Sequence, residues 1–192
     1  VNKKRLPIKE AKLKQLQKEC IHLDDDIRWL VALVSDTGMR LSEAVGLLVD
    51  DLVIDAQQPY VNLIVHPHRR LKTDSSERII PLVGTSLWAA QRIKQTQNSQ
   101  FCFARYCDTD NCNSNSASAA INKWIKTIAG AEAVIHGFRH GFRDRLRAVE
   151  APVDMIDQLG GWSLRSVGQG YGDGYPLELI YRWMEKIVLP QS

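Results

Sequence analysis

Two short stretches place an arginine three residues from a side chain that could assist it. TGMRLSEAVGL (37–47) pairs Arg40 with Glu43, and HGFRH (136–140) pairs His136 with Arg139. Residues three apart share one face of a helix, where an arginine can bind a phosphate through two parallel hydrogen bonds. Glu43 could orient Arg40, and the imidazole of His136 could move a proton. The stretches therefore predict a phosphate-handling site, although the first alone is more typical of a surface ion pair and the second of a solvated basic helix.

A lysine and two tyrosines add further reactive groups. Lys72 lies in RRLKTDSSERIIPL (69–82), a predicted β-hairpin. Partial desolvation could lower the pKa of a lysine there below its usual ~10.4, so that the ammonium donates a proton. Hairpin lysines are, however, commonly solvated. Tyr171 and Tyr175 lie in LGGWSLRSVGQGYGDGYP (159–176), whose glycines allow loop conformations that present either hydroxyl. A tyrosine can act as a covalent nucleophile, and Tyr175, just before Pro176, could instead anchor the last helix.

The elements that must hold these residues are mainly helical. Hydrophobic spacing predicts helices over 9–21, 27–38, 40–48, 84–97, 116–130, 134–149, 152–160 and 176–189. The acidic cluster at 24–26 can cap the second helix, and Thr37 is the expected N-cap of the third. Short β-rich runs at 51–55, 60–67 and 78–82 predict a small three-stranded antiparallel sheet. The predicted fold class is mainly α (α+β), in a single domain.

Composition and charge are those of an ordinary globular protein, with 44% hydrophobic residues, 24% charged residues and a net charge of +3. Basic residues cluster at 66–72 and 136–147, whereas acidic residues gather at 24–26 and 49–51, which predicts one positive face. No apolar run approaches the ~20 residues needed to span a bilayer. The charged opening segment lacks a signal-peptide core, so a cytoplasmic location is the default expectation.

The cysteines do not predict a metal site. The chain has four of them: Cys20, Cys102, Cys107 and Cys112. The last three follow a C-x4-C-x4-C spacing, which is looser than the usual zinc pairing even if His66 and His68 supplied other ligands. All four are therefore expected to be buried or incidental free thiols.

The motifs, taken in order, resemble those of a known family. TGMRLSEAVGL, LKTDSSERIIPL, HGFRH, and LGGW followed nine residues later by a tyrosine resemble the tyrosine recombinases, or phage-type integrases. The resemblance extends over residues 36–171 and includes a Cre-like Gly-Gly-Trp variant of the third motif. It implies the catalytic fold of that family and site-specific breakage and rejoining of DNA through a 3′-phosphotyrosyl link. Integration or excision of a phage or mobile element is the implied setting, with no metal, ATP or other cofactor.

The resemblance also assigns roles to individual positions. The catalytic positions would be Arg40, Lys72, His136, Arg139, Trp162 and Tyr171. Lys72 would protonate the leaving 5′ oxygen, and Tyr171 would be the nucleophile, with Tyr175 as the alternative. Trp162 stands where many members have a second histidine, and because an indole N–H only donates, His136 is the one candidate base. The expected supporting residues are Glu43 and His140, the latter packed within the fold, and the expected DNA contacts are Arg69, Arg70 and Arg143.

The resemblance implies partners and leaves alternatives open. The implied partners are double-stranded DNA attachment sites, a homotetramer on DNA with exchanged C-terminal helices, and accessory DNA-bending proteins. Residues 1–192 would be the catalytic domain alone, without the core-binding domain that precedes it in typical members, and the last helix could dock in cis as readily as in trans. A type IB topoisomerase would use the same residues, and a non-catalytic DNA-binding regulator could share the fold.

Overall fold

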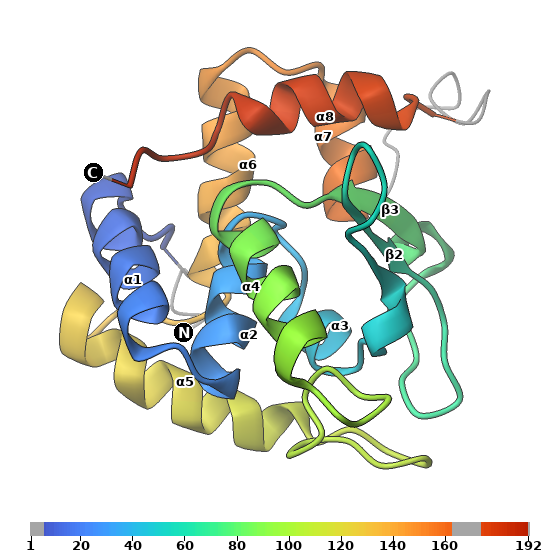
Figure 1. Ribbon diagram of the computed structural model, residues 1–192. Coiled ribbons are helices and arrows are strands. Elements are labelled where there is room, and N and C mark those ends of the chain that lie inside the picture. The colour runs from blue at the N-terminus through green and yellow to red at the C-terminus, as the bar shows by residue number, and fades with distance from the viewer. Residues whose placement is uncertain (1–5, 163–173, 192) are drawn as a thin grey trace.

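The computed structural model describes residues 6–162 and 174–191. Its helices are α1 (Glu10–Leu23), α2 (Asp26–Ser35), α3 (Leu41–Val45), α4 (Gly84–Thr96), α5 (Ser114–Ala129), α6 (Gly137–Ala148), α7 (Val153–Gly160) and α8 (Leu177–Glu185). Its strands are β1 (Leu52–Val53), β2 (Tyr60–Leu63) and β3 (Arg78–Pro81), with short 3-10 turns at Val49–Asp51 and Asp74–Ser76. The predicted class is confirmed: a mainly helical domain carries a small sheet at one side (Figure 1).

Helix α2 is the buried centre of the helical part, where it packs against α4 and contacts α1, α3, α5 and α6 (Figure 1). It begins where the acidic cluster predicts, because the Asp25 carboxylate accepts the backbone N–H of Arg28 at 3.0 Å. Between Trp29 and Val34 every side chain is apolar and buried. A helix that is apolar all round belongs in a core. The segment that leads to Arg40 follows this buried helix directly, so its starting point is fixed by the core.

The three strands form the predicted antiparallel sheet, in the order β1–β2–β3. Leu52 pairs with Val61, and Val61 pairs with Ile80. All three side chains are fully buried, so this face of the sheet packs on the core. The hairpin between β2 and β3 covers residues 64–77 and contains Lys72.

The start of α3 differs from the prediction. Thr37 does not cap α3, because its Oγ1 donates to the carbonyl of Leu33 at 2.7 Å and so closes the end of α2. Arg40 itself is the N-cap residue, and Glu43 Oε1 accepts its backbone N–H at 2.8 Å. Arg40 therefore lies just before the first turn, where the carboxylate three residues on satisfies its N–H.

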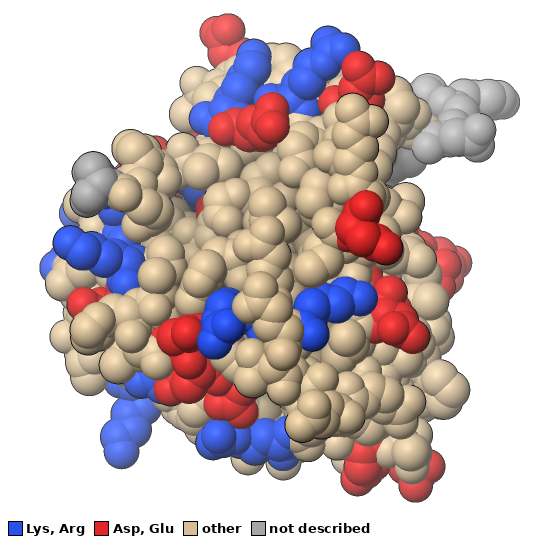
Figure 2. Space-filling view, viewed as in Figure 1, with Lys and Arg blue, Asp and Glu red and all other residues tan. Residues whose placement is uncertain are grey.

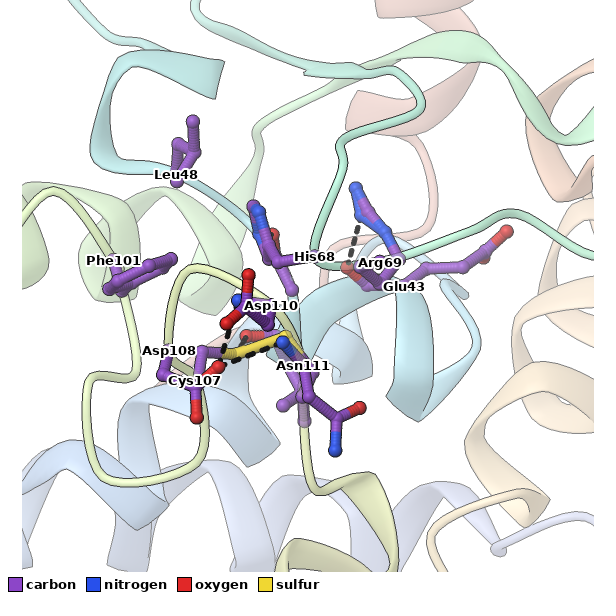
Figure 3. Close-up of a disulfide and its surroundings, with 12 residues drawn as sticks. Glu43, Leu48, His68, Arg69, Phe101, Cys107, Asp108, Asp110 and Asn111 are labelled. Carbon is purple, nitrogen blue, oxygen red and sulfur yellow. Dashed lines mark hydrogen bonds between the residues drawn. A yellow bond between two sulfur atoms is a disulfide. The ribbon is translucent and has the colours of Figure 1, made fainter.

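Cys107 and Cys112 form a disulfide, so the prediction of four free thiols is wrong (Figure 3). Asp108 closes the turn between them, because its Oδ1 accepts two backbone N–H groups at 2.9 Å. The spacing of the cysteines excludes a typical zinc site, but it does not show that the chain turns sharply between Cys107 and Cys112 and brings their sulfur atoms together. Cys20 and Cys102 are free and buried, and burial raises the pKa of both thiols.

Within residues 6–162 and 174–191, no helix combines the length and the apolar character needed to cross a membrane. The same residues contain no group of three or more His, Cys, Asp or Glu side chains arranged to hold a metal ion. Figure 2 shows acidic and basic side chains intermixed on the face seen in Figure 1. The positive face predicted from the clustering is therefore not this one.

Candidate active site

Four of the candidate residues line one pocket of about 380 Å³. Arg40 reaches it from the start of α3, Lys72 from the hairpin, and His136 and Arg139 from the start of α6. Helix α5 adds polar residues to the lining, namely Ser114, Asn115, Ser118 and Asn122. Segments that are far apart in the chain thus present three cationic groups and an imidazole to a single concave surface.

Glu43 is buried beside this pocket, with 1% of its surface exposed. Besides the backbone N–H of Arg40, its carboxylate accepts the Arg40 guanidinium, with Oε2 at 3.1 Å from Nη1. Burial by itself would raise the pKa of Glu43. The hydrogen bonds and positive charge of Arg78, together with those of Arg40, outweigh burial and hold the pKa below its usual value. Glu43 is therefore an anion at neutral pH, and it fixes the side chain of Arg40 at the pocket wall.

Arg78, at the start of β3, is a site residue that sequence reasoning missed. Its Nη2 donates to Glu43 Oε1 and its Nη1 to Glu43 Oε2, both at 3.0 Å, which makes a bidentate pair. Its Nε donates to the carbonyl of Leu159 at 2.8 Å. A signal was present, because Arg78 lies two residues before buried Ile80 and so on the inward face of its strand. A charged residue at an inward position indicates a buried partner.

Arg139 joins two other parts of the site. Its Nη1 donates to the carbonyl of Gly38 at 2.8 Å and to that of Gly160 at 2.9 Å, which ties α6 to the segment before α3 and to the end of α7. Burial, then the positive charges of Arg40 and Arg78, lower the pKa of Arg139 to about 9. The guanidinium is still charged at neutral pH, and an anion beside it would raise its pKa again. The pocket therefore favours an anionic ligand.

Trp162 lies over the arginines of α6. Its ring centroid is 4.4 Å from Cζ of Arg139 and 3.9 Å from Cζ of Arg143, which are cation–π distances. The glycines before it make this possible. A Cβ at Gly160 would clash with the indole ring, and Gly161 ends α7 in the left-handed conformation with φ 64°.

The histidines of α6 lie together. His136 is the half-buried N-cap residue of α6, and its ring meets that of His140 edge to face, with 5.2 Å between centroids. His140 is half-buried, and its expected supporting role stays a prediction. Lys72 is exposed where the hairpin borders the pocket, so its amine remains accessible to a ligand.

Of the two candidate tyrosines, only Tyr175 lies in the part of the chain that the structure describes. Tyr171 lies outside the described residues. The Tyr175 hydroxyl donates to Asp154 Oδ1 at 2.7 Å, and its backbone N–H and carbonyl both bond the side-chain amide of Gln158. The hydrogen bond to Asp154 raises the pKa of Tyr175, with smaller contributions from burial and from the charge of Asp154. Tyr175 thus anchors the chain at the start of α8, and its hydroxyl is made harder to ionise.

The three arginines expected to contact DNA differ in exposure. Arg69 is 5% exposed, and its Nη2 donates to the carbonyl of Ile64 at 3.0 Å and its Nη1 to that of Glu43 at 3.4 Å (Figure 3). These bonds connect the hairpin to α3. A side chain buried in this way is not available for the expected contact with DNA. Arg70 is exposed and Arg143 is half-buried, so both stay as expected contacts.

Comparison of the coordinates with solved structures finds chains of the same fold. The Tn1549 transposon integrase (residues 82–397), solved in complex with circular intermediate DNA, superposes with a TM-score of 0.66 at 16% identity. That match covers 97% of this chain and 68% of the integrase chain. The XerA recombinase superposes with a TM-score of 0.60 at 14% identity, over 96% of this chain and 60% of the recombinase chain. This chain thus corresponds to roughly two thirds of each solved chain.

Sequence comparison agrees with the shared fold. No curated protein sequence gives a significant match. The model of the phage integrase family, however, matches residues 7–175, which is most of the chain and includes every motif described above. The chain therefore belongs to the phage integrase family and has the fold of a tyrosine recombinase catalytic domain.

Proposed function

We propose that this chain is the catalytic domain of a site-specific DNA recombinase that cuts and rejoins strands through a 3′-phosphotyrosyl intermediate. The observation that carries the proposal is the meeting of Arg40, Lys72, His136 and Arg139 at one pocket, in a chain of the phage integrase family. Integration or excision of a phage or another mobile element is the proposed setting. The likeness to a transposon integrase bound to circular intermediate DNA supports it.

The attack step follows from the charges at the pocket. A phosphodiester is an anion, and the transition state of its cleavage spreads negative charge over the non-bridging oxygens. Arg40 and Arg139 bind those oxygens, and the indole N–H of Trp162 donates a further hydrogen bond. Tyr171 Oη attacks phosphorus while its proton passes to His136. The new P–Oη bond forms as the bond from phosphorus to the 5′ oxygen breaks.

The leaving-group step is assigned to Lys72. The departing 5′ oxygen is a poor leaving group as an alkoxide, and the Lys72 ammonium protonates it to a hydroxyl. Because one phosphate ester replaces another, the bond energy is retained, and a second 5′-hydroxyl can reverse the reaction without ATP. Double-stranded DNA is the proposed partner, bound by a homotetramer, with accessory DNA-bending proteins assisting assembly.

The role of Lys72 can be tested by changing the leaving group. The assay follows denaturant-resistant protein–DNA adducts on nicked duplexes from the flanking attachment region, with either oxygen or sulfur at the 5′ bridging position. Lys72→Ala should slow adduct formation by about 10²- to 10⁴-fold on the oxygen substrate. On the sulfur substrate, Lys72→Ala should form the adduct at nearly the wild-type rate, because a thiolate leaves without a proton. Lys12→Ala, exposed on α1, is the control that should match the wild type on both substrates.

Other outcomes would change the assignment. Equal defects of Lys72→Ala on the two substrates would remove Lys72 as the proton donor. Salt-dependent DNA binding without any wild-type adduct would favour a non-catalytic regulator. Relaxation of supercoiled plasmid without strand exchange between two sites would favour a topoisomerase.

A further inference from the structure

Arg78 connects two parts of the candidate active site without lining the pocket. Its side chain is 3% exposed. On one side it forms the bidentate pair with Glu43, and on the other its Nε donates to the carbonyl of Leu159. Its Nη1 also donates to the carbonyl of Ser76 at 2.7 Å, at the end of the hairpin. A single guanidinium thus touches the segment of Glu43, the hairpin and the end of α7.

Each of these contacts leads to a group at the pocket. Glu43 holds both the backbone N–H and the guanidinium of Arg40, whose side chain is 19% exposed and lines the pocket. Leu159 is followed by Gly160, whose carbonyl accepts Arg139, and by the turn that lays Trp162 over the arginines of α6. A displacement of Arg78 would therefore move Arg40 through Glu43, and it would move Trp162 through the turn after Leu159.

The charge of Arg78 also decides the state of Glu43. A carboxylate that is only 1% exposed would tend to neutralise, and Arg78 supplies the largest effect that keeps it ionised. A neutral Glu43 would bind the Arg40 guanidinium more weakly, because hydrogen bonds between ionised partners are about twice as strong as neutral ones. Arg40 would then be free to leave the pocket wall.

We infer that Arg78 is a positioning residue of the DNA-cleavage site, which sets Arg40 through Glu43 and sets the Trp162 turn through the carbonyl of Leu159. The inference rests on the proposed function for the reaction that it serves. A positional error of about 1 Å can cost about 10²-fold in rate, so a modest shift of Arg40 would be measurable.

The chain offers a matched control. Arg145 on α6 is also buried and also pairs with a buried carboxylate, that of Asp36, at 3.0 Å. It further donates to the carbonyls of Ser35 and Ile187 and does not line the pocket. Arg78 and Arg145 thus share burial and ion pairing, and they differ in their connection to the pocket.

The test compares Arg78→Lys and Arg78→Met with Arg145→Lys, at a temperature where each variant is folded. The single-turnover rate of adduct formation is measured on saturating nicked duplex, and DNA affinity is measured separately at fixed salt. Arg78→Met should slow adduct formation by about 10²-fold, Arg78→Lys should restore part of the rate, and DNA affinity should change by less than about twofold. Arg145→Lys should lower stability and leave the adduct rate of the folded protein unchanged. Equal rates for wild type and the Arg78 variants, or an equal slowing by Arg145→Lys, would overturn the inference.

A second readout does not depend on cleavage. The side-chain Nε–H resonance of Arg40, identified by its loss in Arg40→Lys, should shift or broaden in Arg78→Met and in Glu43→Gln, and it should stay in place in Arg145→Lys. An unmoved resonance in Arg78→Met would overturn the inference by itself. If the wild-type protein forms no adduct at all, the proposed function fails, and this resonance still decides the role of Arg78.

Discussion

Three arginines and one carboxylate dominate the site at the scale of single residues. Arg40, Arg78 and Arg139 lie close enough to repel one another, and Glu43 lies among them as a buried anion. Removal of the Glu43 carboxylate from such a buried group typically costs about 3–5 kcal/mol, because the two arginines that it pairs with stay charged. One carboxylate does not neutralise three guanidinium groups, so the site keeps a positive charge for a phosphate. Glu43 thus holds the buried arginines together, and under the proposed function it also positions Arg40 for the phosphate.

Tyr175 gives a prediction on stability and pH. Tyr175→Phe removes the hydrogen bond to Asp154 and should lower the free energy of unfolding at pH 7 by about 0.5–1.5 kcal/mol. The pKa of Tyr175 is raised in the folded state, so its contribution is fully present below the unfolded pKa of 10.0 and is lost as the pH rises through the folded value. Urea unfolding should therefore separate the two proteins at pH 7 and bring them together in strong alkali. A difference that grows with pH would contradict the assigned hydrogen bond.

At the scale of elements, the turn after α7 connects separate parts of the site. Two buried arginines hold its carbonyls, Arg78 at Leu159 and Arg139 at Gly160. The C-terminus of a helix carries partial negative charge, which suits both guanidinium groups. The turn leads directly to Trp162, so α7 positions the third motif against the first two.

Gly161 tests how tightly this turn is packed. It adopts φ 64°, and a Cβ there would lie 2.5 Å from Nη1 of Arg78. Gly161→Ala should destabilise the protein by about 1–2 kcal/mol from backbone strain, with a further cost from displacing Arg78. Asn tolerates the left-handed conformation better than Ala. Gly161→Asn should still be less stable than the wild type in thermal unfolding, whereas equal stability would show that no crowding exists at Arg78.

The disulfide gives a second prediction at this scale. Cys107 and Cys112 close a short loop, so reduction should lower the free energy of unfolding by roughly 2 kcal/mol. The measurement is the urea midpoint with and without dithiothreitol. The double variant Cys107→Ser, Cys112→Ser should be insensitive to the reductant, because Cys20 and Cys102 are already free thiols. A wild-type midpoint that does not move on reduction would show that the bond does not stabilise the fold.

The sequence predicts the elements better than their connections. The apolar core of α2 and the alternation in β2 and β3 follow from spacing, and so does the arginine and histidine pattern of α6. The role of Thr37 could not be predicted because the end of α2 and the start of α3 compete for its hydroxyl. The role of Arg78 could not be predicted because its partner, Glu43, is distant in the sequence. Arg69 is an expected DNA contact, but its side chain is buried because it donates to carbonyls of the hairpin and of α3, which the sequence pattern does not reveal. Side-chain partners of this kind are set by tertiary packing, which periodicity does not encode.

At the scale of the whole molecule, α8 closes the fold of its own chain. It lies across one end of the domain, near α6, α7 and β3 (Figure 1). Ile180 and Met184 are buried, and the Tyr181 hydroxyl donates to the carbonyl of Leu82 at 3.1 Å. Arg145 holds the carbonyl of Ile187 just beyond the helix. The single chain therefore has α8 docked in cis, and the exchange proposed for a tetramer would have to replace these contacts.

The identity of the DNA-linked residue is the most direct test of the proposed cleavage mechanism. Adducts would be formed on nicked duplexes, digested with nuclease and protease, and the modified peptide sequenced by mass spectrometry, beside Tyr171→Phe and Tyr175→Phe. We expect a nucleotide on Tyr171, no adduct from Tyr171→Phe, and a normal adduct from Tyr175→Phe at neutral pH. A nucleotide on Tyr175, or an adduct that survives Tyr171→Phe, would contradict the assignment of Tyr171 as the nucleophile.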